Sequence, residues 1–187
     1  MNYLSGKKPV IILIAIVLIV LAVLGGFWIA AKNNNSFSQF KIELPVGEMS
    51  TDGLGIDSSE KYENQKVIMQ ISLPSEWKIN GTVFDDAAGN KVGETGPAVV
   101  KDGGLPDEKF FTTDVAEGKK INLLEKYNLS KSGNNIAAYH TIYENGTYES
   151  YHYVVDTGKY AFILKFYGSK DSRRMFDSIA QSVSVGE

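Results

Sequence analysis

The chain has 187 residues, a formal charge of −3 and no cysteine, which excludes disulfides, thiolate metal sites and cysteine nucleophiles. Three of its 19 basic residues and none of its 22 acidic residues lie in the first 32 positions, so the other 155 residues carry a charge of −6, from 16 basic and 22 acidic side chains. This balance argues against nucleic acid or an anionic membrane surface as a partner, because both select a basic patch.

Residues 10–31 form a run of 22 residues without a charge, long enough for a helix to cross a bilayer. A signal peptide is the alternative, but this run exceeds the roughly 7–15 apolar residues of a signal core and lacks an A-x-A-like cleavage site. Lys7 and Lys8 precede the run, against Lys32 and Lys41 after it, which favours a cytoplasmic N-terminus. The sequence therefore predicts a cytoplasmic segment 1–9, a single transmembrane helix 10–31 and an extracytoplasmic remainder at the cell membrane.

Small residues recur at every fourth position of this run, at Ala22, Gly26 and Ala30. Such spacing permits close helix–helix contact and so a weak homodimer through the membrane helix. The alternative is that glycine and alanine are simply frequent in membrane helices.

Residues 32–64 are predicted to form a polar linker. Within it, Phe40, Ile42 and Leu44 alternate with polar residues, which predicts a strand over 40–44 that Pro45 ends. The stretch 46–64 is rich in glycine, serine and acidic residues and has no sustained period. The compact domain is accordingly expected to occupy residues 65–187.

The sequence predicts strands followed by one helix in the first half of that domain. A strand is predicted over 65–73, and a hairpin joins 82–85 to 91–94 through a turn at 86–90. Asp114 and Glu117 have the spacing of a capping box, and Ile121, Leu124 and Tyr127 would share one face of a helix behind it.

Three β-rich runs follow, at 135–143, 147–155 and 160–167, and an amphipathic helix is predicted over 170–181. Asn145-Gly146 is a preferred two-residue turn, and such a turn pairs His140 with Tyr151 and Tyr139 with His152. The two histidines would then lie on opposite faces of the sheet, too far apart to share a zinc ion.

This pairing, extended by a Val155–Tyr160 pair, gives the meander one hydrophobic face and one amphipathic face. The amphipathic face is a candidate binding surface for a protein or small-molecule partner. The alternative is that a second layer, such as the helix near Leu124, covers this face as ordinary core. The candidate binding residues are Tyr139, Tyr143, Tyr148, His152 and Tyr167.

Sequence motifs for hydrolases, zinc proteases, phosphate loops and calcium loops are absent. The acidic loop pairs Asp85-Asp86 and Asp107-Glu108 could bind calcium weakly or serve a hydrolase, although acidic pairs commonly just favour turns. We therefore predict no catalytic residue, no metal site and no cofactor.

Three segments carry a family resemblance: a strand running into LPSEW (73–77), LLEKY (123–127) and the closing FDSIAQSV (176–183). Over about residues 65–186 the chain resembles a PsbP-like domain. The resemblance implies an α+β fold, an α/β/α sandwich around a mainly antiparallel sheet. It also implies accessory rather than enzymatic work, since the best-known member is an extrinsic photosystem II subunit; a photosynthetic role is not carried over.

Together these observations predict a membrane-anchored extracytoplasmic domain with a non-catalytic accessory or binding role at the cell envelope. One alternative is a surface hydrolase that uses the acidic loop residues. Another is the ectodomain of a membrane regulatory complex, in which the nine residues before the membrane run would be too few for an output domain.

Overall fold

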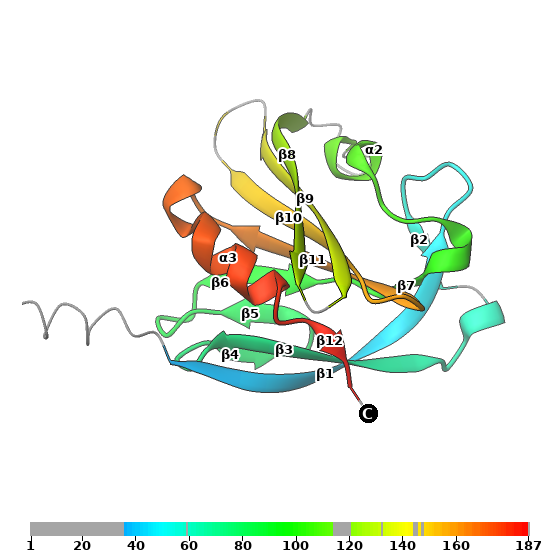
Figure 1. Ribbon diagram of the computed structural model, residues 1–187, viewed down its shortest axis with the longest axis horizontal. Coiled ribbons are helices and arrows are strands. Elements are labelled where there is room, and N and C mark those ends of the chain that lie inside the picture. The colour runs from blue at the N-terminus through cyan, green and yellow to red at the C-terminus, as the bar shows by residue number, and fades with distance from the viewer. Residues whose placement is uncertain are drawn as a thin grey trace, which may run out of the picture. The chain divides into compact units, whose positions relative to one another are not determined.

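The computed structural model describes residues 36–58, 60–113, 121–131, 133–143, 146 and 148–186 (Figure 1). The predicted transmembrane helix over 10–31, with Ala22, Gly26 and Ala30, lies outside these residues. None of the helices that the structure describes is both long and apolar enough to cross a membrane. The folded unit begins at Phe37, so the boundary expected at residue 65 falls inside it.

Strands make up most of the described fold, and its helices are short. The strands are β1 (Phe37–Met49), β2 (Ile56–Asp57), β3 (Lys66–Pro74), β4 (Lys78–Asn80), β5 (Val83–Asp85), β6 (Lys91–Thr95), β7 (Ala98–Val100), β8 (Ile121–Lys131), β9 (Asn134–Tyr143), β10 (Glu149–Asp156), β11 (Tyr160–Tyr167) and β12 (Ser184–Val185). The helices are α2 (Glu108–Thr112) and α3 (Arg173–Ala180), with 3₁₀ turns η1 (Glu60–Tyr62), η2 (Lys101–Gly103) and η3 (Lys170–Ser172).

The predicted α/β/α sandwich is therefore wrong: the fold is mainly β. Twelve strands of the described residues form one sheet with the central order β12-β3-β1-β7-β11-β10-β9-β8. The two α-helices have only 5 and 8 residues, too few to cover both faces of such a sheet as layers.

The main difference lies in β8, a strand at a position where the sequence predicts a helix. Its side chains alternate between half-buried and exposed from Ile121 to Ser130, as a period of two requires. Glu125 breaks the apolar series in that period, so the spacing of Ile121, Leu124 and Tyr127 resembles a helical face instead. Pairing with β9 decides the outcome, and a register shift between Leu123 and Glu125 marks a bulge at Leu124.

The strand β1 also extends beyond its predicted end at Pro45. It pairs with β3 in antiparallel fashion up to Pro45↔Lys66, and then with β7 in parallel from Val46↔Ala98. The proline therefore stands where the strand changes partners. A segment that lacks a hydrophobic period locally is held in the sheet by a strand about fifty residues later.

The meander is confirmed, and its first register matches the prediction. His140 pairs with Tyr151, and Tyr139 pairs with His152. The second register differs by two residues, because Val155 pairs with Phe162 rather than Tyr160. A shift of two preserves the pleat, so every side chain keeps its predicted face.

The two faces of the meander bury different clusters. On the face that we call the core face, the meander packs with β1, β3 and α3 into the larger cluster, and α3 contacts both β10 and β3 (Figure 1). The predicted C-terminal helix is confirmed as η3 and α3, with Phe176 and Ile179 buried. The opposite face, the pocket face, carries a smaller cluster under α2. Meander residues of the core face include Ile136, Ala138, His140, Tyr151, Tyr153, Val155, Phe162, Leu164 and Phe166; those of the pocket face include Tyr139, Thr141, Ser150, His152, Val154, Ile163 and Lys165.

Candidate ligand-binding site

A pocket of about 490 Å³ lies on the pocket face, between the sheet, α2 and the segment that leads into β2. Its volume falls within the range of small-molecule sites. Most of its lining is apolar, with a few polar side chains among the strands. The lining residues are Leu54, Ile56, Glu94, Thr95, Gly96, Pro97, Phe110, Phe111, Thr113, Ile121, Tyr143, His152, Ile163 and Lys165.

The bulge in β8 determines which of its side chains reach this pocket. Before the bulge, Ile121 lines the pocket and Leu123 packs on the smaller cluster. After it, Tyr127 and Leu129 pack on the larger cluster of the core face. The extra residue therefore lets one edge strand contribute apolar side chains to both faces.

The short helix α2 forms a wall of the pocket. Its N-cap is Asp107, whose carboxylate accepts a hydrogen bond from the backbone N–H of Lys109 at 2.9 Å. This turn directs Phe111 into the protein, where its ring lies 4.9 Å from the Tyr139 ring and 4.8 Å from the His152 ring, measured between centroids. Phe111 thus covers Tyr139 and His152 on the pocket face.

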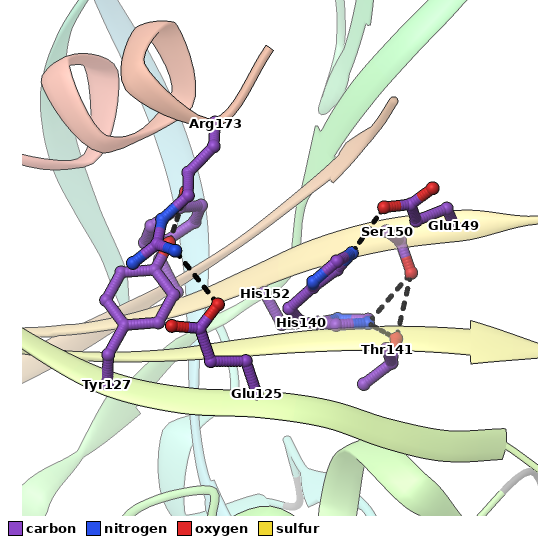
Figure 2. A network of polar contacts seen from close by, with 9 residues as sticks. Glu125, Tyr127, His140, Thr141, Glu149, Ser150, His152 and Arg173 are labelled. Atoms are coloured by element: carbon purple, nitrogen blue, oxygen red, sulfur yellow. Dashed lines mark hydrogen bonds and ion pairs between the residues drawn. The ribbon is translucent and has the colours of Figure 1, made fainter. Parts of the chain in front are cut away.

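The buried hydroxyl groups of Thr141 and Ser150 hold the His152 ring in place. Nε2 lies 3.0 Å from the Thr141 hydroxyl and 3.1 Å from the Ser150 hydroxyl, and the two hydroxyls are 3.1 Å apart (Figure 2). His152 is 7% exposed. Burial and the positive charge of Lys165 lower the pKa of His152 to about 3, so the ring is neutral at physiological pH.

Charged groups from β6 and β11 stand at another side of the pocket. A Glu94 carboxylate oxygen accepts from the Tyr167 hydroxyl at 2.6 Å, and the other pairs with Lys91 at 2.7 Å. Lys165 Nζ lies 4.0 Å from the same carboxylate. Partial burial opposes ionisation of Glu94, but Lys91, Tyr167 and Lys165 together keep its pKa below the usual value.

The structure brings some of the predicted binding residues together and separates others. Tyr143 and His152 line the same pocket, whereas Tyr139 is 3% exposed under Phe111 and lines a second pocket of about 570 Å³. Tyr148 is 62% exposed and lies edge-on to Tyr143. Tyr167 reaches Glu94 beside the pocket. α2 covers part of this face, a role the sequence analysis considered for the segment near Leu124.

The other histidine lies on the core face, as the predicted register requires. His140 Nε2 is 2.6 Å from a Glu149 carboxylate oxygen (Figure 2). The His140 ring stacks on the Tyr151 ring, with centroids 4.1 Å apart and planes 7° apart. The sheet therefore separates the two imidazoles, which excludes a zinc ion bound by both.

A polar network on the core face was not foreseen from the sequence. Arg173 of α3 pairs with Glu125 at 2.9 Å and lies over the Tyr127 ring at 3.9 Å (Figure 2). Asp177 accepts hydrogen bonds from the Tyr127 hydroxyl at 2.7 Å and the Tyr153 hydroxyl at 2.8 Å. These contacts fasten α3 to β8 and β10, so we read the network as structural. The pattern Glu-x-Tyr in a strand was its only local signal.

Two of the four acidic loop residues, Asp86 and Asp107, take local structural roles. The Asp86 carboxylate accepts from the backbone N–H groups of Ala88 and Asn90, which closes the turn between β5 and β6. Asp107 caps α2, Asp85 belongs to β5, and Glu108 is exposed in the first turn of α2. These contacts are those of turns and caps.

No protein-family model matches the sequence, and no curated protein matches it. Among solved structures, the chain is similar to the solution structure of cyanobacterial PsbP (CyanoP) from Synechocystis sp. PCC 6803. The sequence identity is 13%, the TM-score is 0.50, and the match covers 81% of this chain and 94% of the other. At this identity the likeness concerns the fold alone. The chain therefore has a PsbP-like fold.

Proposed function

We propose that the protein is a non-catalytic binding domain at a membrane, and that the pocket beside His152 takes a small amphipathic molecule. The observation that carries the proposal is a neutral, nearly buried imidazole in the lining of an otherwise mainly apolar pocket. Ligand sites commonly combine apolar walls with a few polar groups that fix orientation.

The contacts of His152 support binding rather than acyl transfer. Ser150 and His152 are at hydrogen-bond distance, which is the first requirement of a nucleophile and its base. However, Ser150 is only 2% exposed and does not belong to the pocket lining. A histidine with a pKa of about 3 is also a poor general base near pH 7. The described residues place no carboxylate in hydrogen bond with Nδ1, where a triad would have one.

The uncharged run over residues 10–31 supports a membrane location for this domain. A site for amphipathic molecules fits that location, because such molecules concentrate at membrane surfaces. The second pocket is larger, but its lining holds no buried imidazole. The proposal therefore concerns the pocket at His152.

Blocking the pocket should weaken binding of a small amphipathic probe at least tenfold. Thr113 is exposed at the pocket rim, so Thr113→Trp places a large ring over the opening. Ser130 is also exposed and lines the second pocket, and Ser130→Trp is the matched control. We expect hexan-1-ol and hexanoate to bind the full-length chain in lipid nanodiscs, with heat measured against empty nanodiscs.

In this calorimetric experiment, wild type and Ser130→Trp should give the same affinity for the better probe, and Thr113→Trp should lose at least tenfold. If neither probe binds the wild-type chain, or if Thr113→Trp binds as well as wild type, the pocket is not the binding site and the proposal fails.

A further inference from the structure

We propose that the natural ligand of this pocket is a monocarboxylate with an apolar tail, whose carboxylate accepts a hydrogen bond from Nδ1–H of His152. The inference rests on the proposed function and names the chemistry of its ligand. It follows from the count of hydrogen-bond donors and acceptors around the ring, from the charges at the pocket and from its apolar walls.

The two hydroxyl groups determine which nitrogen of His152 carries the proton. Thr141 and Ser150 are both buried, and their hydroxyls contact only each other and Nε2 among the described side-chain partners. If Nε2 is an acceptor, one of the two hydroxyls donates its proton to Nε2. The second hydroxyl donates either to Nε2 as well or to the oxygen of the first hydroxyl, so both hydroxyl protons form hydrogen bonds. If Nε2 carried a proton, one buried hydroxyl proton would have no acceptor in this group, which costs about 1–3 kcal/mol.

A neutral imidazole whose Nε2 accepts must carry its proton on Nδ1. Among the described residues, Nδ1 has no hydrogen-bond partner, while the ring itself lines the pocket. The ring that lines the pocket therefore carries an N–H donor that no described residue uses, and an acceptor atom of a ligand would satisfy it. Thr141 and Ser150 act as positioning residues, since they set the tautomer without lining the pocket.

The charges at the pocket favour an anionic acceptor. Lys165 from β11 carries a positive charge that acts on His152, and Lys91 and Glu94 stand beside it on β6. Glu94 is held by Lys91 and by the Tyr167 hydroxyl, so this side of the pocket combines two ammonium groups with one carboxylate that already has partners. A carboxylate can pair with Lys165 and accept a hydrogen bond from Nδ1–H, whereas an ammonium group could pair only with Glu94, which Lys91 and Tyr167 already hold.

The walls define the rest of the ligand. Aliphatic and aromatic side chains surround the polar corner, and they come from α2, the strand edges and the segment before β2. An apolar tail buried there gains about 0.8 kcal/mol for each CH₂ group removed from water. The wall residues are Leu54, Ile56, Phe110, Phe111, Ile121 and Ile163.

Three probes with the same tail separate the head-group claim from the pocket claim. Hexanoate, hexan-1-ol and hexylammonium are titrated into the full-length chain in nanodiscs, for wild type and for His152→Phe, which keeps an aromatic ring and removes the donor. For wild type we expect hexanoate to bind at least tenfold more tightly than hexan-1-ol and hexylammonium to bind weakest. In His152→Phe the preference for hexanoate over hexan-1-ol should fall to threefold or less.

The ratio between probes is the decisive readout, because a variant that merely loosens the pocket lowers both affinities together. Thr141→Val removes a positioning hydroxyl and should reduce the ratio while circular dichroism shows an intact fold. Equal binding of hexanoate and hexan-1-ol in the wild-type pocket would overturn the inference and leave the proposed function standing. No binding of any probe would overturn both. The affinity for a short apolar peptide with a free C-terminal carboxylate, compared with the affinity for hexanoate, tells a peptide ligand from a free acid.

Discussion

Lowering the pH from 6.5 to 4.5 should destabilise the wild-type protein by about 2 kcal/mol more than it destabilises a His152→Gln variant. The folded protein holds the pKa of His152 at about 3 because the ring is buried and Lys165 is near. The unfolded chain restores an ordinary pKa of about 6.5. Between pH 6.5 and about 3, His152 is therefore protonated in the unfolded state and neutral in the folded state.

The sign follows from this difference in proton uptake. The free energy of unfolding decreases as the pH falls, and its slope approaches about 1.4 kcal/mol per pH unit. The decrease levels off near the pKa that His152 has in the folded state. Carboxylates such as Glu94 and Asp86, whose pKa values the fold lowers, contribute their own losses, but these are common to both proteins. The comparison with His152→Gln therefore isolates the imidazole.

Urea denaturation of the full-length chain, followed by near-ultraviolet circular dichroism at several pH values, measures the effect. His152→Phe provides a second non-titrating variant if the glutamine side chain disturbs the fold. Parallel loss of stability in wild type and both variants between pH 6.5 and 4.5 would show that His152 titrates normally, against the structure.

The second large effect concerns Gly93, whose replacement by alanine should destabilise the fold by about 1–3 kcal/mol. Gly93 stands in β6 between Phe84 of β5 and Phe166 of β11. The two rings stack over it with centroids 5.9 Å apart. A Cβ atom at this position would come within 2.6 Å of Phe166 Cδ1 and 2.9 Å of the Lys165 carbonyl oxygen.

The backbone contact makes this clash hard to relieve, because the carbonyl belongs to the paired strand rather than to a flexible side chain. Gly96 is the matched control, since a Cβ added there meets no atom within 4 Å. Urea midpoints should fall for Gly93→Ala and change little for Gly96→Ala. Equal midpoints for Gly93→Ala and wild type would mean that the rings have room to separate.

Local sequence signals sufficed for part of the fold. The Asn145-Gly146 pair and alternating residues on both sides predicted that His140 faces Tyr151, and the structure confirms it. The spacing of Phe176 and Ile179 likewise predicted the buried side of the last helix. These elements succeed because the information that defines them lies within one turn or one hairpin.

Other elements depend on partners far along the chain. β1 continues past Pro45 because β7 pairs with it, and β8 forms a strand because β9 supplies the pairing that its interrupted pattern needs. Neither partner can be recognised from the local period. The predicted fold class was wrong mainly for this reason.

The candidate site was predicted only in outline. Register alone placed His152 on the amphipathic face, together with Tyr143. Its burial could not be foreseen, because the roof is Phe111 of α2, a helix of five residues without a detectable period. The hydroxyls of Thr141 and Ser150 stand at the positions that the register gives, but their joint contact with one nitrogen requires the coordinates.

The protonation state of His152 can be observed directly by ¹⁵N magnetic resonance of the imidazole nitrogens in the histidine-labelled full-length chain. The chain has only two histidines, and His140→Gln assigns the signals. We predict for His152 a protonated Nδ1 and an unprotonated Nε2, unchanged down to pH 4.5, with Nδ1 shifting when hexanoate is added. A proton on Nε2, or protonation of both nitrogens near pH 6.5, would contradict the donor on which the ligand assignment depends.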